Sequence, residues 1–289
     1  MTLGEGSASI GRMPGIDLHT HSDRSDGTLT PTEVVHFAAE RGLDVIALTD
    51  HDTTEGLGEA SGAGREAGLE VVPGVELSAE HEGSSIHVLC YWMDVEHEGL
   101  QQELRRLRED RLQRGERMVE KLHALGFPVS FERVRQIASG GNVVRPHVAQ
   151  AMVEAGVVAT EAEAFARYIG DGGPAHVPKH ALHPLDAVDL IRGAGGLSVL
   201  AHPGMWADQS SVPDELIEAM ADAGMVGLEV DHTDHPPERR AYYRELAGRL
   251  GLIPTGGSDC HGTRYEPIRL GTSLCDPAAF GALRELAGS

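Results

Sequence analysis

The 289-residue sequence has few cysteines, no long apolar run and no internal repeats. Its three cysteines, Cys90, Cys260 and Cys275, include no CxxC spacing. An odd number of unclustered cysteines favours reduced thiols, as in a cytoplasmic protein. No string of eighteen apolar residues occurs, so the sequence predicts no membrane-spanning helix. Residues 1–13 are small, polar and rich in Gly and Ser, without a secretory signal, and we expect them to be flexible.

Basic residues are also scarce, since 24 Lys and Arg stand against 45 Asp and Glu and give a formal net charge of −21. Non-specific binding to duplex DNA depends on clustered Lys and Arg, so we expect no broad electrostatic contact with a duplex. A small phosphorylated substrate stays compatible with this charge, because screening beyond about 8 Å makes local charge outweigh the total. The sequence makes no prediction about the oligomeric state.

Apolar runs of strand length alternate with helical stretches over most of the chain, which is typical of an α/β fold with a largely parallel sheet. Four strands are expected before residue 99 and three after residue 177. They cover residues 16–18, 43–48, 69–75, 85–91, 197–201, 226–230 and 252–255. Seven strand units predict a TIM-like barrel one unit short of the usual eight, although an open sheet also fits the periodicity.

The alternation stops between residues 99 and 177, where the chain is rich in Arg, Glu, Gln and Ala, with leucines at roughly helical spacing. We interpret 99–177 as a helical insertion that caps a barrel formed by residues 14–98 and 178–289. A solvated helical cap without any chemistry is the alternative interpretation.

Histidines and acidic residues follow the ends of the predicted strands. His19 and His21 are two residues apart, so an extended chain places both imidazoles on one face. Because the carboxyl ends of parallel strands meet at one edge, we expect such side chains to converge there. Only His87 lies inside a predicted strand. The candidate metal ligands are His19, His21, Asp26, His51, Glu76, His87, His202, Asp259 and His261.

This mixture of imidazole and carboxylate, with no cysteine, favours zinc, manganese or iron over a structural thiolate site. Three carboxylates facing three divalent ions would leave the cluster strongly cationic. Such a site would attract phosphate even in an acidic protein, and it would lower the pKa of bound water enough to supply a hydroxide nucleophile.

The motifs occur in one order along the chain: His19-Thr20-His21, Thr49-Asp50-His51-Asp52, Glu76 in Gly-Val-Glu, His87, Ala201-His202-Pro203 and Ser258-Asp259-Cys260-His261. From about Ile16 to His261 the sequence resembles the PHP (polymerase and histidinol phosphatase) family. The resemblance implies a distorted (βα)7 barrel with three metal ions at its C-terminal rim.

The resemblance also implies a division of the ligands. His19, His21, Glu76 and Asp259 would hold the first metal. Glu76 would bridge to the second, with His87 and His202, and Asp26, His51 and His261 would hold the third. Asp26 stands where some members of the family have a histidine. The adjacent acids Asp17, Asp50 and Asp52 either orient the ligating imidazoles or cap turns, and the sequence leaves both roles open.

Residues 142–149, Asn-Val-Val-Arg-Pro-His-Val-Ala, resemble a segment of the stand-alone PHP phosphoesterases, which include nucleoside 3′,5′-bisphosphate phosphatases and a 5′-to-3′ exoribonuclease. Arg145 would offer a two-pronged guanidinium to a phosphate, beside the free N–H groups of a helix that starts at Pro146. The candidate substrate contacts are Arg145, His147, Lys179 and His235. Arg145 and Lys179 as ordinary surface charges are the alternatives. His235 is also a candidate general acid, with His232 as its neighbouring alternative.

These features predict a metal-dependent enzyme that hydrolyses a phosphomonoester of a small nucleotide. The expected substrate is a nucleoside 3′,5′-bisphosphate or the 5′ end of a short oligoribonucleotide. A cyclic phosphodiesterase and a histidinol-phosphate phosphatase are the rivals among enzymes. A catalytically silent PHP interaction module is the rival from another class.

Overall fold

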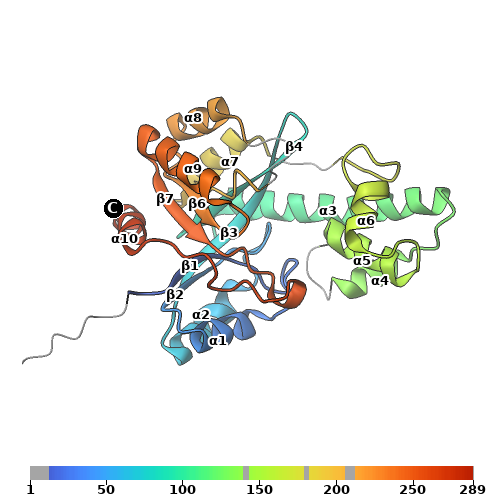
Figure 1. The fold of residues 1–289 in the computed structure, drawn as a ribbon, viewed down its shortest axis with the longest axis horizontal. Coiled ribbons are helices and arrows are strands. Elements are labelled where there is room, and N and C mark those ends of the chain that lie inside the picture. The colour runs from blue at the N-terminus through green and yellow to red at the C-terminus, as the bar shows by residue number, and fades with distance from the viewer. Residues whose placement is uncertain (1–12, 139–142, 179–181, 206–211, 289) are drawn as a thin grey trace, which may run out of the picture.

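The computed structural model describes residues 13–138, 143–178, 182–205 and 212–288 and shows a nearly closed barrel of seven strands in chain order (Figure 1). An isolated parallel bridge between Thr20 and Cys260 joins the first strand to the chain that follows the last one. The sequence therefore predicted the barrel correctly, and the open sheet is excluded. The strands are β1 (Ile16–Thr20), β2 (Val45–Leu48), β3 (Glu70–His81), β4 (Ser84–Tyr91), β5 (Leu197–Leu200), β6 (Gly227–His232) and β7 (Ile253–Gly257).

Helices cover the outside of the barrel, and their ends follow ordinary capping rules. The Thr30 side chain accepts a hydrogen bond from the Glu33 N–H, and Glu33 bonds back to the Thr30 N–H, so a complete capping box starts α1. Gly68 ends α2 in the left-handed conformation, at a φ of 69°. The outer helices are α1 (Pro31–Glu40), α2 (Leu57–Ala67), α7 (Pro184–Gly193), α8 (Asp214–Asp222), α9 (Pro237–Leu250) and α10 (Pro277–Ala287).

One part of the predicted alternation is wrong, because β3 and β4 form an antiparallel hairpin with no helix between them. Glu82 and Gly83 make its turn with positive φ angles of 51° and 82°. Strand β3 continues through Glu76 to His81, and β4 is antiparallel to both of its neighbours. An antiparallel strand brings its first residues to the rim where its neighbours end. This explains why His87 reaches that rim from inside a strand.

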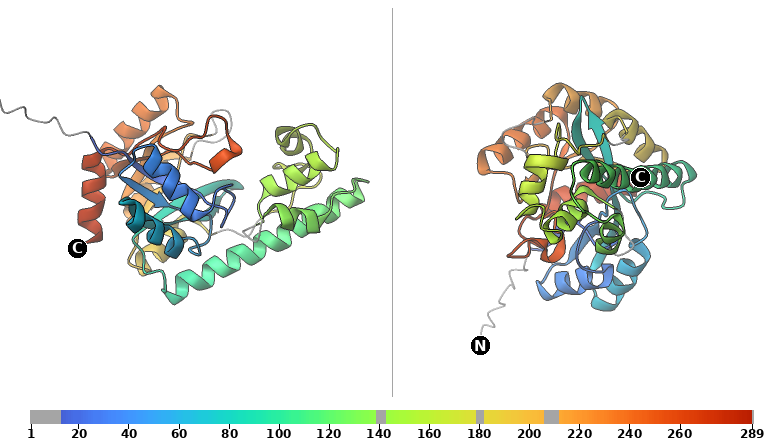
Figure 2. Two further views of the ribbon diagram at one scale, coloured as in Figure 1. Left: turned by 90° about the horizontal axis from the view of Figure 1, so that it is seen from below. Right: turned by 90° about the vertical axis from the view of Figure 1, so that its right-hand side faces the viewer.

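The 27-residue helix α3 (Glu98–Ala124) connects the barrel to the helical insertion (Figures 1 and 2). Its first half packs Leu100, Leu104 and Leu107 into a hydrophobic cluster of the barrel. Its second half contributes Val119 and Leu122 to a separate cluster. That second cluster is shared with α4 (Phe131–Ile137), α5 (Arg145–Glu154), α6 (Glu161–Ala164) and the π-helical turn η1 (Phe165–Ile169).

The two clusters suggest that α3 belongs to both parts of the chain, and the domain boundaries at residues 99 and 177 stay predictions. The predicted flexible segment 1–13 lies, apart from Met13, outside the described residues. Within the described part of the chain, no helix combines the length and the apolar character needed to cross a bilayer. The three cysteines are buried free thiols.

The tight packing of β7 against β1 can be tested at Gly257. A β-carbon on Gly257 would lie 2.7 Å from the backbone nitrogen of His19 and would also meet the His19 β-carbon, neither of which can rotate away. We expect Gly257→Ala to lower the free energy of unfolding by about 1–3 kcal/mol in urea titrations. Gly248→Ala is the control, because a β-carbon there, on the exposed face of α9, meets no atom within 4 Å. Equal stability of the two variants would contradict this packing.

Candidate metal centre

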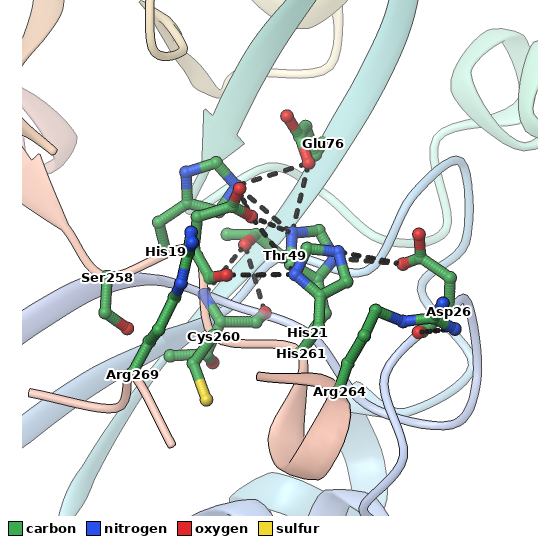
Figure 3. Close-up of polar contacts among 12 residues, drawn as sticks. His19, His21, Asp26, Thr49, Glu76, Ser258, Cys260, His261, Arg264 and Arg269 are labelled. Atoms are coloured by element: carbon green, nitrogen blue, oxygen red, sulfur yellow. Dashed lines mark hydrogen bonds and ion pairs between the residues drawn. The ribbon is translucent and has the colours of Figure 1, made fainter. Parts of the chain in front are cut away.

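All nine predicted ligands are carried by the barrel. His19 lies on β1 and His21 just after it, Glu76 and His87 lie on the hairpin β3–β4, and the others follow β1, β2, β5 and β7. His202 and Asp259 have positive φ angles of 25° and 51°, a backbone conformation that L-residues rarely adopt and that is common at functional sites. Figure 3 shows Glu76, His19, His21, His261 and Asp26 directed toward one another.

The first group consists of His19, His21, Glu76 and Asp259, and the atoms that face one another are Nε2 of both histidines, Oε2 of Glu76 and Oδ1 of Asp259. His19 Nε2 lies 3.1 Å from His21 Nε2, 3.2 Å from Glu76 and 3.4 Å from Asp259. His21 Nε2 lies 3.1 Å from Glu76 and 3.2 Å from Asp259. Donor atoms about 2.1 Å from one tetrahedral cation are about 3.4 Å apart, so these separations fit a single shared metal ion.

The two oxygens of Glu76 face different partners. Oε2 takes part in the first group, whereas Oε1 lies 2.9 Å from His87 Nδ1 and 3.1 Å from His202 Nε2. A carboxylate arranged in this way can bridge two cations. Glu76 and His87 form one candidate group with His51, and His202, the remaining member of the second set implied by the family resemblance, faces the same Glu76 oxygen as His87.

The third group gathers around Asp26. Its Oδ1 lies 3.2 Å from His261 Nε2, and its Oδ2 lies 4.0 Å from His51 Nε2. The rings of His51 and His21 each lie between the Asp26 group and another group, which the resemblance did not indicate. His51 directs Nδ1 to Glu76 at 3.1 Å and Nε2 to Asp26, and His21 Nδ1 lies 3.9 Å from Asp26.

Burial and charge also fit divalent cations. Asp26, Glu76 and Asp259 have 7%, 0% and 8% of their surface exposed, and a buried carboxylate requires a nearby positive charge. Burial alone would raise the pKa of Glu76, but His51, His19 and His87 together hold it well below its usual value. The buried Nδ1 of His21 has no hydrogen-bond partner among the described residues. The donor set therefore fits the metal that the family resemblance implies.

Glu229 on β6 is a site residue that the sequence did not indicate. Its Oε1 accepts a hydrogen bond from Nδ1 of His19 at 3.0 Å, and its Oε2 accepts one from the backbone N–H of His202 at 2.8 Å. The first bond directs the lone pair of His19 Nε2 toward the other ligands. In the sequence, the charge of Glu229 between the apolar residues Leu228 and Val230 could have indicated this role.

The adjacent acids Asp17, Asp50 and Asp52 hold loops rather than imidazoles. Asp17 accepts hydrogen bonds from the backbone N–H groups of Ser258 and Gly271, both at 2.9 Å. Asp50 accepts from the N–H and the hydroxyl of Ser22. Asp52 accepts from the Ser78 N–H and from Arg111. The contacts of Asp17 and Asp50 favour the turn-capping role that the sequence left open, whereas Asp52 connects the loop after β2 to β3 and α3.

His235 is held by backbone groups at both ring nitrogens. Nδ1 donates to the Val230 carbonyl at 2.9 Å, and Nε2 accepts from the Gly204 N–H at 3.1 Å. Burial lowers its pKa to about 4, so the ring is neutral at pH 7. Its predicted roles as a substrate contact and general acid are not favoured by this conformation. The alternative, His232, is buried with Nε2 3.6 Å from Asp259 Oδ2.

The candidate substrate contacts of the insertion differ in position. Arg145 begins α5 and pairs with Asp171 at 2.9 Å, where Asp171 is largely exposed. His147 is buried, and its Nδ1 accepts a hydrogen bond from the Val144 N–H, which caps its own helix. Lys179 lies outside the described residues.

Arg264, three residues after His261, links the metal centre to the insertion. Its guanidinium donates to the carbonyl of Asp26 at 3.2 Å (Figure 3). It also lies 3.5 Å from Glu161 of α6. No motif in the sequence pointed to this residue. It places an additional positive charge next to the Asp26 group.

The comparisons with known proteins agree with this geometry. A family model for the PHP domain matches residues 17–129. A 3′,5′-nucleoside bisphosphate phosphatase from Chromobacterium violaceum is 36% identical over 250 residues, 86% of this chain and 88% of that protein. The 5′-3′ exoribonuclease Rnm from Salmonella typhimurium is 35% identical over 267 residues, 91% of this chain and 90% of that protein.

A third relative, a phosphoribosyl 1,2-cyclic phosphate 1,2-diphosphodiesterase from Eggerthella lenta, is 33% identical over 254 residues, 85% of this chain and 94% of that protein. A solved structure from Bifidobacterium adolescentis, assigned as a metal-dependent phosphoesterase, superposes with a TM-score of 0.88 at 36% identity and covers 94% of this chain and 96% of that chain. The fold and the site thus define a metal-dependent phosphoesterase. The chain belongs to the PHP family.

The contact between Glu229 and His19 can be tested with Glu229→Gln, which keeps the shape of the side chain and removes its charge. We expect metal affinity to fall about 10- to 100-fold, because a carboxylate behind a ligating imidazole orients the ring and raises its basicity. The affinity would be measured by competition with a chromophoric chelator. Glu218→Gln on the exposed side of α8 should leave the affinity unchanged. A Glu229→Gln protein with full affinity would remove Glu229 from the site.

A second prediction concerns pH and metal removal. Burial lowers the pKa of His21, but hydrogen bonds to Asp259 and Glu76 outweigh this and raise it to about 10, and the pKa of His19 is raised well above 6.5 by Glu229, Glu76 and Asp259. Burial lowers the pKa of His51 to about 3, so His51 stays neutral above pH 6.5. The metal-stripped folded protein therefore binds more protons than the unfolded chain above pH 6.5.

The stability of the metal-stripped protein must then fall as the pH rises from 6.5 towards 10, because the unfolded chain releases these protons first. In the metal-loaded protein, cations replace these protons and the fall should be absent below pH 9.0, above which the buried cysteines lower the stability of both forms. Thermal unfolding of both forms across this pH range measures the difference. Parallel curves for the stripped and loaded forms would contradict the proposed role of the two histidines.

Proposed function

We propose that this metal-dependent phosphoesterase removes a phosphate from a small nucleotide that carries two phosphates, or from the 5′ end of a short oligoribonucleotide. The observation that carries the proposal is the convergence of imidazoles and carboxylates at one barrel mouth, beside an insertion that presents arginines. The bisphosphate phosphatase and the exoribonuclease, each aligned over most of both chains, support the nucleotide class.

We further propose three divalent cations of manganese, zinc or iron. His19, His21, Glu76 and Asp259 would hold the first. Glu76, His87 and His202 would hold the second, and Asp26, His51 and His261 the third. When bound, such ions would polarise a phosphate and lower the pKa of a water, so that hydroxide would be available to attack phosphorus near neutral pH.

Side chains of the protein would orient the ligands, contact the phosphate and protonate the leaving group. Glu229 and the carbonyl of Asp259 hold the His19 and His261 rings with Nε2 facing the other ligands. Arg145 would neutralise phosphate charge from the side of the insertion, since its partner Asp171 is exposed and can be displaced. His232, rather than His235, is the histidine beside Asp259, and we propose it as the proton donor to the leaving group.

A cyclic phosphodiesterase is the second candidate, because the Eggerthella lenta relative has that name and aligns over most of both chains. Such an enzyme opens a cyclic phosphate diester and would need no second phosphate on its substrate. None of the relatives described above is named a histidinol-phosphate phosphatase. The many buried ligands at the mouth argue against a silent interaction module.

The test is phosphate release by the manganese-, zinc- or iron-loaded protein from a panel of esters. We expect the highest kcat/KM for adenosine 3′,5′-bisphosphate or a 5′-phosphorylated dinucleotide, compared with adenosine monophosphates, cyclic phosphates and histidinol phosphate. His19→Ala and Asp259→Ala should each abolish turnover and lower the bound metal measured by elemental analysis. Full activity with full metal content in either variant would contradict the assignment, and a preference for cyclic esters would favour the second candidate.

A further inference from the structure

A short turn follows the last candidate ligand at the rim of the barrel. The 3₁₀ turn η2 (Gly262–Arg264) begins directly after His261, and Arg264 at its end donates to the Asp26 carbonyl at 3.2 Å. The turn is thus held against the loop that carries a ligand of the third group. Because the loops after the strands of such a barrel surround its functional site, the next residue, Tyr265, lies at the mouth of the metal centre.

Arg269 connects Tyr265 to the loop after β6. Its guanidinium carbon lies 3.9 Å from the centre of the Tyr265 ring, and its Nη1 donates to Asp234 at 2.7 Å. The Asp234 N–H in turn donates to the ring of His232, whose Nε2 lies 3.6 Å from the ligand Asp259. Figure 3 shows Arg269 beside the ligand cluster. A chain of contacts therefore runs from the Tyr265 ring to a metal ligand.

The ring of Tyr265 has one covered face and one open face. The Arg269 guanidinium covers one side, and 42% of the residue is nevertheless exposed, so the exposed surface belongs to the edge and the other side. Burial raises the pKa of the hydroxyl against the opposing charge of Arg269, and the negative charge of Asp259 adds to the rise. The hydroxyl is therefore neutral at pH 7, and the ring lies within the electric field of the metal ligands.

Tyr242 shows that exposure alone does not distinguish Tyr265. It is 43% exposed, but it lies on the outer helix α9. Its hydroxyl donates to Asp214 at 2.7 Å, and its ring meets the Tyr243 ring edge to face, with the centres 5.3 Å apart. Neither of these partners is a candidate metal ligand. Position beside the metal centre is what sets Tyr265 apart.

A flat aromatic surface beside a cluster of metal ligands suits a compound with an anionic group at one end and a planar ring at the other. Nucleobases stack on exposed aromatic side chains, and the contact tolerates any base because every base has a π face. Arg269 and its partner Asp234 hold the Tyr265 ring in one orientation, so little conformational entropy is lost when a base stacks on it.

We propose that Tyr265 is the stacking surface for a nucleobase of the substrate and that Arg269 positions its ring. This inference rests on the proposed function and adds a specificity-determining residue to it. The base is either the one on the ribose whose phosphate is hydrolysed or the base of the next nucleotide in a short RNA. Phosphate esters without a base make no such contact, so Tyr265 distinguishes nucleotides from sugar phosphates.

A binding experiment tests the proposal independently of turnover. In metal-loaded Tyr265→Trp, adenosine 5′-monophosphate, adenosine 3′,5′-bisphosphate or a 5′-phosphorylated dinucleotide should quench the fluorescence of the added indole, because stacking brings the base against the ring. Ribose 5-phosphate should bind without this quenching. The wild-type protein, which has two tryptophans, gives the background signal. Equal quenching by the nucleotides and by ribose 5-phosphate would overturn the proposal.

Kinetics then compare metal-loaded wild type and Tyr265→Ala by kcat/KM for the same four compounds. We expect a loss of about 5- to 150-fold on the nucleotides, mainly through KM, since one stacked base contributes that much to affinity. The value for ribose 5-phosphate should be unchanged. A loss on all nucleotides assigns the base of the hydrolysed nucleotide to Tyr265, whereas a loss on the dinucleotide alone assigns the next base to it.

Tyr242→Ala is the matched control, because Tyr242 is as exposed as Tyr265 but lies on the outer helix α9. Tyr265→Phe keeps the ring and should retain the wild-type preference. Arg269→Gln should raise KM for nucleotides but not for ribose 5-phosphate. Tyr265→Leu replaces Tyr265→Ala if thermal unfolding shows that the alanine variant does not fold.

The two readouts separate this inference from the proposed function. An equal loss on nucleotides and ribose 5-phosphate, or no loss at all, in a protein that hydrolyses nucleotides would overturn the stacking surface and leave the proposed function intact. If the wild type hydrolyses no nucleotide but nucleotides alone quench the Tyr265→Trp fluorescence, the proposed substrate is wrong and the stacking surface stands.

Discussion

The arrangement of the metal centre depends on Glu76, a fully buried carboxylate in the middle of β3. Ring nitrogens of five histidines lie within 3.2 Å of its two oxygens: His19, His21, His51, His87 and His202. A carboxylate in this position is tolerated only when positive charge surrounds it, supplied by imidazolium protons or by cations. Because the buried Glu76 carboxylate needs positive charge around it, the other strands must carry imidazoles or other metal ligands at the same level of the barrel.

That requirement also explains the distortion of the barrel. A strand that runs parallel to its neighbours ends at the rim, whereas Glu76 is followed by five more residues of β3. The hairpin to β4 lets the sheet extend beyond the rim on this side and return, and the return strand carries His87 opposite Ser78. Glu76 is thus bonded into the sheet on both sides, through the bridge to His51 and the pairing with Leu89. A long central strand holds it more rigidly than a loop would.

The sequence predicted the parts of this structure that depend on local patterns. The barrel, the start of α1 at Thr30 and the convergence of strand-end ligands follow from periodicity, capping and strand direction. The hairpin was missed because the apolar pattern of residues 69–75 and 85–91 does not show the direction of a strand. Pairing with β3 and β5 decides the direction of β4. Glu229 and Arg264 were missed because each acts on a residue distant in sequence, His19 and Asp26 respectively.

The distribution of charge between the barrel and the insertion has a physical consequence for specificity. Metal ligands on or just after six of the seven strands of the barrel have little freedom, because moving one backbone segment disturbs the shared carboxylate Glu76. Arg111 on α3 and Arg145 on α5 lie outside the barrel strands, and Arg111 contacts Asp52, which follows the candidate ligand His51. Under the proposed function, in which Arg145 contacts the substrate, substitutions on these helices change which phosphate ester is held while the metal ligands stay in place. Relatives with the same fold but differently named substrates are what such a separation would produce.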